Sequence, residues 1–216
     1  MQNHQLQRTR KVTYTALFAA VATALMYLEF TLPFMPPFLK VDLSGAVTLL
    51  AAFMFGPLPA VSITLIKDII HFFSSTTGGV GELADFIITS SFAVTAALIY
   101  RRNHSRKGAY LGCAAAVVVM TVVGMLANKF LLIPFFSTIM PVEAIVSACQ
   151  ALNPLIGDIN TYIIFGAGPF NLLKGLILSL LTCLLYKRLS TLIHTHGIFP
   201  DKAVKKEQCE APTTQN

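Results

Sequence analysis

Apolar runs, most of them long enough to cross a lipid bilayer, follow one another along most of this chain. Hydrophobic residues make up 55% of the 216 residues, charged residues only 12%, and the mean hydropathy is positive. Soluble domains do not have such a composition. Because a spanning helix needs about 20 apolar residues, the length allows five or six crossings and no additional soluble domain. We therefore predict an all-α integral membrane protein.

Turn-forming or basic residues divide the apolar part of the chain into six stretches. A proline-rich connection from Pro33 to Pro37 follows the first stretch, where missing backbone donors forbid a regular helix. Gly56-Pro57-Leu58-Pro59 separates the second stretch from the third. The sequence between Ser137 and Pro169 is too polar to cross lipid as a unit. The predicted spans are residues 12–32, 44–55, 60–75, 82–100, 109–136 and 170–186.

The positions of lysine and arginine predict the orientation, because short cytoplasmic loops retain these residues. Six spans with both termini in the cytoplasm place the basic residues of 8–11, those of 101–107 and those after 186 on the same side. The predicted organisation is a cytoplasmic segment (1–11), a six-helix transmembrane domain (12–190) and a cytoplasmic, disordered tail (191–216).

Several function classes are excluded by what the sequence lacks. The net charge of +6 arises from blocks beside apolar runs, which is typical of contact with anionic lipid and not with nucleic acid. Neither a Cys-x-x-Cys pair nor a His-Glu-x-x-His motif occurs, so no metal site is predicted. The phosphate-binding loop of an ATPase is also missing. We predict no catalytic residue and no cofactor.

Polar side chains inside the predicted spans are candidate ligand contacts, because each is costly in lipid unless it has a partner. Asn171 and Lys174 are three residues apart and so share a helix face, and Pro169 is predicted to begin that helix. An asparagine amide pairs well with the alternating carbonyl and N–H edge of a pyrimidine-like ring, and Asn128 offers a second amide. Alternatively, Asn171 caps the last helix and Lys174 extends outward to the membrane surface.

Other charged residues favour structural roles. Lys67 and Asp68 are adjacent, and adjacent side chains on a helix diverge by about 100°. We therefore predict that they form no tight pair with each other and have structural partners on other helices. Glu82 is predicted to be a favourable charge at a helix N-terminus.

Ala16, Ala20 and Ala24 form a small-residue stripe at four-residue spacing in the first span. Such a stripe lets another helix approach closely in lipid. It predicts either a docking face for another protein or packing against a neighbouring span of the same chain.

Several segments together resemble a known family, and the resemblance covers most of the chain, from the first span to about Ser190. They are the alanine stripe, Phe38–Ser44, Phe55–Leu58, Gly78–Ala84 and Pro169–Gly175. In these segments the chain resembles the substrate-binding S component of energy-coupling-factor (ECF) vitamin transporters, and within that family the riboflavin-specific branch.

The resemblance implies a six-helix fold in a prokaryotic cell membrane, with an external pocket at the outer ends of the last three spans. Asn128, Asn171 and Lys174 would hydrogen-bond the flavin, while Leu39 and Asp42 would belong to a gating loop after the first span. The alanine stripe would meet a transmembrane coupling subunit driven by two ATP-binding subunits.

Asp85 departs from the family, because an amide is expected at this position.

Two alternatives to riboflavin capture stay open. One is an S component for another vitamin, such as thiamin or a biotin-like compound. The other is a stand-alone secondary transporter that uses Asp68 or Glu82 as a proton site.

Overall fold

The computed structural model describes residues 2–31, 39–75, 77–139, 141–151 and 153–195. The chain divides into two units, Met1–Thr182 and Cys183–Asn216, and the packing described below belongs to the first. Most described residues are helical, and two short strands form one hairpin. The elements in chain order are α1 (Gln2–Met26), β1 (Phe30–Thr31), β2 (Lys40–Val41), α2 (Ser44–Phe55), α3 (Pro57–Phe72), α4 (Val80–Arg102), α5 (Arg106–Ala127), η1 (Asn128–Leu132), α6 (Ile133–Phe136), α7 (Val142–Gln150), α8 (Ile159–Tyr162), η2 (Ile163–Ala167) and α9 (Gly168–Thr195).

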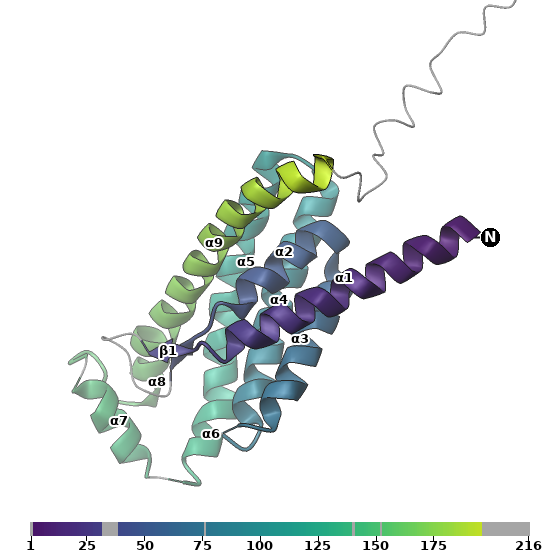
Figure 1. Cartoon of the computed structure of the whole chain (residues 1–216). Coiled ribbons are helices and arrows are strands. Elements are labelled where there is room, and N and C mark those ends of the chain that lie inside the picture. The colour runs from purple at the N-terminus through teal and green to yellow at the C-terminus, as the bar shows by residue number, and fades with distance from the viewer. Residues whose placement is uncertain (1, 32–38, 76, 140, 152, 196–216) are drawn as a thin grey trace, which may run out of the picture. The chain divides into compact units, whose positions relative to one another are not determined.

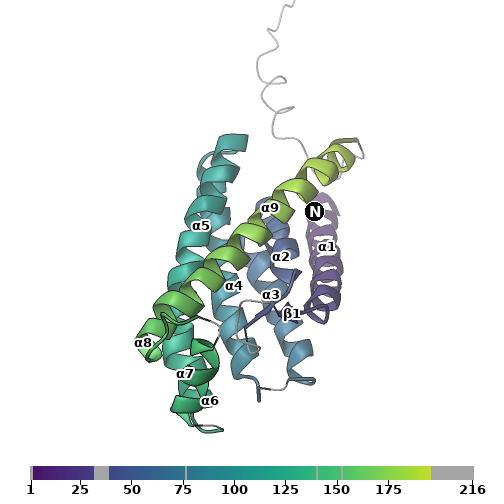
Figure 2. The same cartoon turned by 90° about the vertical axis from the view of Figure 1, so that its left-hand side faces the viewer.

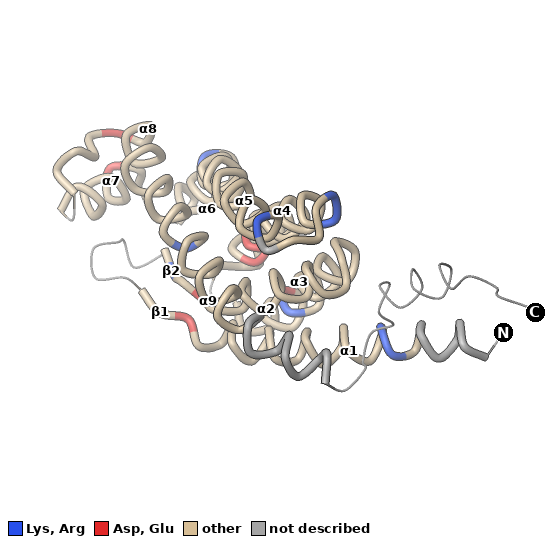
Figure 3. The backbone as a smooth tube through the Cα atoms, turned by 90° about the horizontal axis from the view of Figure 1, so that it is seen from above, with Lys and Arg blue, Asp and Glu red and all other residues tan. Residues whose placement is uncertain are grey.

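The helices of the first unit form a bundle of rods that run alternately up and down (Figures 1 and 2). Two of these rods are composite, because α5, η1 and α6 follow one another without a break, as do α8, η2 and α9. The turn between α4 and α5 lies at one end, and the α3–α4 turn and α7 lie at the other. Seen from above, most of the backbone belongs to residues other than Lys, Arg, Asp and Glu (Figure 3).

The turn between α2 and α3 forms where the sequence predicts it. Gly56 has a φ of 98°, a left-handed conformation that disfavours residues with a side chain. Pro57 then begins α3, where its missing N–H costs nothing. The two helices have 12 and 16 residues, which correspond to lengths of roughly 18 and 24 Å.

Three helices among the described residues are long and apolar enough to cross a membrane: Val80–Arg102, Lys107–Phe136 and Ile159–Leu185. They include the predicted spans 82–100 and 109–136 and most of 170–186. α2 and α3 are shorter than the roughly 30 Å hydrocarbon layer of a bilayer. The six crossings and the cytoplasmic position of both termini stay predictions.

The last helical rod begins earlier than predicted. The helix starts at Ile159 and runs through Pro169, so the prediction that Pro169 begins this helix is wrong. Asp158 caps the start, where its side chain accepts a hydrogen bond from Thr161 N at 2.7 Å. At the other end α9 reaches Thr195, inside the segment predicted as the tail. The rest of the predicted tail, and the predicted connection Pro33–Pro37, lie outside the described residues.

Small side chains pack α1 against the bundle. Ala19 and Ala22 are buried against Val47 and Ala51 of α2 and against Ile63 of α3. Ala16, Ala20 and Ala24 lie on the exposed side of the same helix. The predicted alternative of internal packing therefore applies to the neighbouring alanines and not to the predicted stripe.

Candidate functional site

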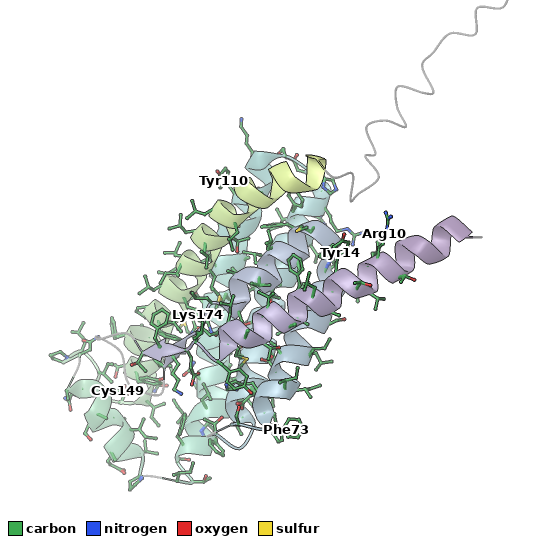
Figure 4. All side chains as sticks on the ribbon, viewed as in Figure 1. Arg10, Tyr14, Phe73, Tyr110, Cys149 and Lys174 are labelled. Carbon is green, nitrogen blue, oxygen red and sulfur yellow. The ribbon has the colours of Figure 1, made fainter. Side chains whose placement is uncertain are left out.

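A cavity of about 580 Å³ is formed by the hairpin and by the helix ends near the α3–α4 turn. Small-molecule sites have volumes of roughly 300–1,000 Å³, so this cavity is large enough for a ligand with several rings. Figure 4 shows Lys174, which lines the cavity, between the end of the bundle with Tyr110 and the end with Phe73 and Cys149. Other lining residues include Leu39, Asp42, His71, Glu82, Asp85, Asn128, Phe136, Ile145, Phe170 and Asn171.

The two predicted asparagines meet in this cavity on facing helices. Asn128 donates from Nδ2 to the carbonyl of Gly124 at 2.8 Å and accepts from the Tyr162 hydroxyl at 3.0 Å. Asn171 donates from Nδ2 to the carbonyl of Ala167 at 2.8 Å. No described residue donates to Asn171 Oδ1, so this oxygen is available to a ligand. Both asparagines are only 2% exposed, and the chain therefore holds their amides in fixed orientations.

Gly124 allows the close approach of the two helices that carry the asparagines, and its role was not predicted from the sequence. A Cβ atom at this position would lie 2.4 Å from Asn171 Cγ, so no side chain fits between the two helices. The same residue supplies the carbonyl that orients Asn128. A glycine inside a long apolar run is the signal that could have identified it, because small residues mark close helix contacts in membranes.

Each asparagine is associated with a π-helical segment that is followed by a proline, since Asn128 begins η1 and Asn171 lies four residues after the end of η2. In η1 the Ile133 N–H bonds to the carbonyl of Asn128, and in η2 the Gly168 N–H bonds to the carbonyl of Ile163. These wider turns accommodate Pro134 and Pro169, which lack the N–H that a regular helix requires. The helix therefore continues through Pro169, and Asn171 lies within it and is not a cap.

A chain of ion pairs connects α3, α4, α9 and the hairpin. Lys174 Nζ lies 2.9 Å from Asp42 Oδ2 and 3.1 Å from Asp85 Oδ1. Asp85 also lies 2.5 Å from Lys67, which in turn lies 2.7 Å from Asp68. Lys174 is buried by these contacts, so it does not extend to the membrane surface as the alternative interpretation required.

The prediction that Lys67 and Asp68 form no tight pair is wrong. Their Cα–Cβ bonds do diverge on the helix, but the long lysine side chain bends until its ammonium reaches the carboxylate of the next residue. The ammonium also reaches Asp85 on α4, as expected for a partner on another helix. Asp85, where the resemblance led us to expect an amide, lines the cavity and links the two lysines.

The hairpin places the two predicted gating residues at the cavity. Phe30 pairs with Val41 and Thr31 with Lys40 in its two strands. Leu39 and Asp42 are buried beside them and line the cavity.

Asp42 is fixed by several partners. It accepts from Ser44 N at 2.9 Å and from Lys174. Burial and the nearby Asp85 carboxylate raise the pKa of Asp42, but the ammonium groups of Lys174 and Lys67 and the Ser44 hydrogen bond outweigh them, so the pKa lies below its ordinary value. Asp42 is therefore charged at neutral pH and holds the hairpin to α9.

A second polar cluster lines the cavity between α3 and α4. Glu82 lies 2.9 Å from His71 Nδ1, and it accepts hydrogen bonds from Ser75 at 2.8 Å and Thr77 at 3.3 Å. Glu82 does lie in the first turn of α4, as predicted. It also anchors His71, which the sequence did not indicate because a single histidine at the end of an apolar run has no distinctive spacing.

Comparison with known proteins gives one consistent family. The family model described as "ECF transporter, substrate-specific component" matches residues 10–186. A solved structure described as that of the S component of a bacterial ECF transporter is similar, with a TM-score of 0.70 and 30% identity. The match covers 86% of this chain and 98% of that structure.

Three similar proteins are named riboflavin transporters. The protein RibU of Staphylococcus aureus is 31% identical over 87% of this chain and 94% of its own length. FmnP of Bacillus subtilis is 25% identical over 84% and 93% of the two chains. RibU of Streptococcus thermophilus is 26% identical over 89% and 88%.

Proposed function

Because the chain belongs to the family of ECF transporter substrate-specific components, we propose that it binds riboflavin for uptake across a bacterial cell membrane. Its similarity to the Staphylococcus aureus riboflavin transporter, which extends over 87% of the chain, carries this proposal. The family consists of transporter components and not of enzymes, and the polar groups in the cavity act by binding. Riboflavin is then the transported substrate and not a cofactor.

The cavity chemistry supports a flavin. The isoalloxazine ring is flat, with apolar faces and one edge of alternating carbonyl and N–H groups. Leu39, Ile145 and Phe170 offer apolar walls, while Asn128 and Asn171 offer fixed amides beside them. Most of the ligand surface can be apolar if the few polar edge groups find such partners, which is the usual design of small-molecule sites.

Riboflavin binding is testable with the purified protein in detergent. We expect saturable heat release in calorimetry, because the polar edge of the ring gains buried hydrogen bonds, and quenching of flavin fluorescence, because electron-rich side chains such as Tyr27 line the cavity. The chain contains no tryptophan, so protein emission interferes little with the flavin signal. Thiamin and biotin serve as controls and should compete poorly. Folded protein that binds thiamin or biotin but not riboflavin would assign a different vitamin.

The wider mechanism is also part of the proposal. The cavity would open to the outside, opposite the end with Arg101 and Arg102, as the positions of the basic residues favour. Release toward the cytoplasm would require a transmembrane coupling subunit and two ATP-binding subunits, because this chain has no ATP-binding motif. Uptake that survives ATP depletion but requires a proton gradient would instead support a secondary transporter.

We propose that Ala16, Ala20 and Ala24 form the docking face for the coupling subunit. All three are exposed, and their small side chains let a partner helix approach closely. Ala20→Trp should therefore reduce riboflavin uptake by about tenfold or more while the dissociation constant of riboflavin changes by less than about twofold. Uptake is measured in cells and binding with the purified variant.

Val118→Trp is the matched control, because Val118 is 60% exposed on α5 and far from α1 in the chain. It should leave both uptake and binding unchanged. If Ala20→Trp also supports normal uptake, the docking face lies elsewhere.

A further inference from the structure

The cavity has two sides of different chemistry. Apolar residues from the hairpin, α7 and α9 line one side, including Leu39, Ile145 and Phe170. The other side, formed by the ends of α1 and α3 and the turn before α4, presents Tyr27, His71, Ser74, Thr77 and Glu82. Figure 3 shows α7 and α3 on opposite sides of the bundle. A ligand that fills the cavity therefore meets apolar walls with the two asparagine amides at one end, and hydroxyl, imidazole and carboxylate groups at the other.

The hydrogen bonds of His71 define which ring nitrogen faces a ligand. Glu82 accepts at 2.9 Å from Nδ1, and because a carboxylate only accepts, Nδ1 carries the proton. No described residue forms a hydrogen bond with Nε2. Ser75 and Thr77 hold the carboxylate from its other oxygen, so the imidazole orientation is fixed through Glu82. The side chain is only 14% exposed, although it lines the cavity.

Nε2 of such a histidine accepts a hydrogen bond when the ring is neutral and donates one when the ring is charged. A hydroxyl group can satisfy both states, because it donates and accepts. Ser74 also lines the cavity, and its hydroxyl oxygen can accept a hydrogen bond, because its one hydrogen is directed either to the Tyr27 hydroxyl at 3.1 Å or to the carbonyl of His71 at 3.0 Å. Two groups that can accept thus line the same cavity, which suits a chain of hydroxyl groups.

We propose that the polar side of the cavity, centred on His71 Nε2, binds the hydroxylated ribityl chain of riboflavin. The isoalloxazine ring then lies on the apolar side, beside Asn171. This inference rests on the proposed function and adds to it a second set of contacts that determines specificity. It assigns His71 to ligand contact, and Glu82 to positioning, because Glu82 acts through the imidazole.

Two substitutions separate ligand contact from the bond to Glu82. In His71→Gln the terminal amide lies near the former Nε2, whereas in His71→Asn the shorter amide lies near the former Nδ1. We expect His71→Asn to raise the dissociation constant of riboflavin about five- to tenfold, as for one or two lost hydrogen bonds, and His71→Gln to change it less than about twofold. The reverse order would mean that His71 acts only through Glu82, and would overturn the proposal.

Lumiflavin, which carries a methyl group in place of the ribityl chain, identifies the part of the ligand concerned. Its affinity, measured by competition against riboflavin, should be the same in the wild type and in both His71 variants. Ile145→Ala, on the apolar side, should weaken both flavins equally. Equal losses of both flavins in His71→Asn would place the ring at His71 and contradict the proposal. A wild-type protein that binds neither flavin would instead refute the proposed function itself.

Discussion

Lys174→Met is expected to lower the free energy of unfolding by about 3–5 kcal/mol and to raise the riboflavin dissociation constant by about a hundredfold or more. The lysine neutralises two carboxylates, at 2.9 and 3.1 Å, on the hairpin and on α4. Its removal leaves Asp42 buried without its cation, while Asp85 keeps Lys67. Stability is measured by unfolding in mixed detergent micelles followed by circular dichroism, and affinity by calorimetry.

A double substitution distinguishes lost stability from lost binding. Lys174→Met combined with Asp42→Asn removes the unpaired charge, and most of the stability should return. The affinity for riboflavin should stay low, because the hairpin is no longer held to α9 at the cavity. A single Lys174→Met variant with wild-type stability and affinity would show that these ion pairs have no net effect.

Gly124→Ala is expected to raise the riboflavin dissociation constant about ten- to hundredfold, the effect of losing a well-placed polar contact in a buried site. The new Cβ would overlap the Asn171 side chain, 2.4 Å from its Cγ, and force the amide away from its position. Global stability should change much less, because alanine favours a helix by about 1 kcal/mol relative to glycine. Calorimetry and thermal unfolding measure the two effects.

Two controls accompany this variant. Gly157→Ala introduces the same methyl group where no atom lies within 4 Å, and it should leave binding unchanged. Gly124→Ala combined with Asn171→Ala should bind no more weakly than Asn171→Ala alone, because the glycine acts through the asparagine. Additive losses would show that Gly124 affects binding by another route.

Much of the helical organisation follows from local sequence signals. The predicted stretch 44–55 coincides with α2, because Gly56 and Pro57 permit only one boundary there. Asn128, Asn171 and Lys174 were identified as polar groups in apolar helices, and the structure brings all three to one cavity. Their predicted contact with a ligand stays a prediction.

The remaining features depend on tertiary structure. Pro169 is a reliable helix breaker only where no wider turn accommodates it, and η2 accommodates it here. The Lys67–Asp68 pair depends on how a long side chain bends once Asp85 lies nearby. His71 acquires its orientation from Glu82, eleven residues away in the chain, and no local pattern indicates that contact.

The attachment of the hairpin has a kinetic consequence. Its outer ion pair, between Glu29 and Lys40, is partly exposed, so solvent and salt weaken it. Its inner ion pair, between Asp42 and Lys174, is buried and is screened far less. If Leu39 and Asp42 gate the cavity, opening the hairpin must break the inner pair and expose Leu39 to water. Because this pair forms within the protein itself, the barrier slows the entry of a ligand as well as its escape, and these residues set both rates.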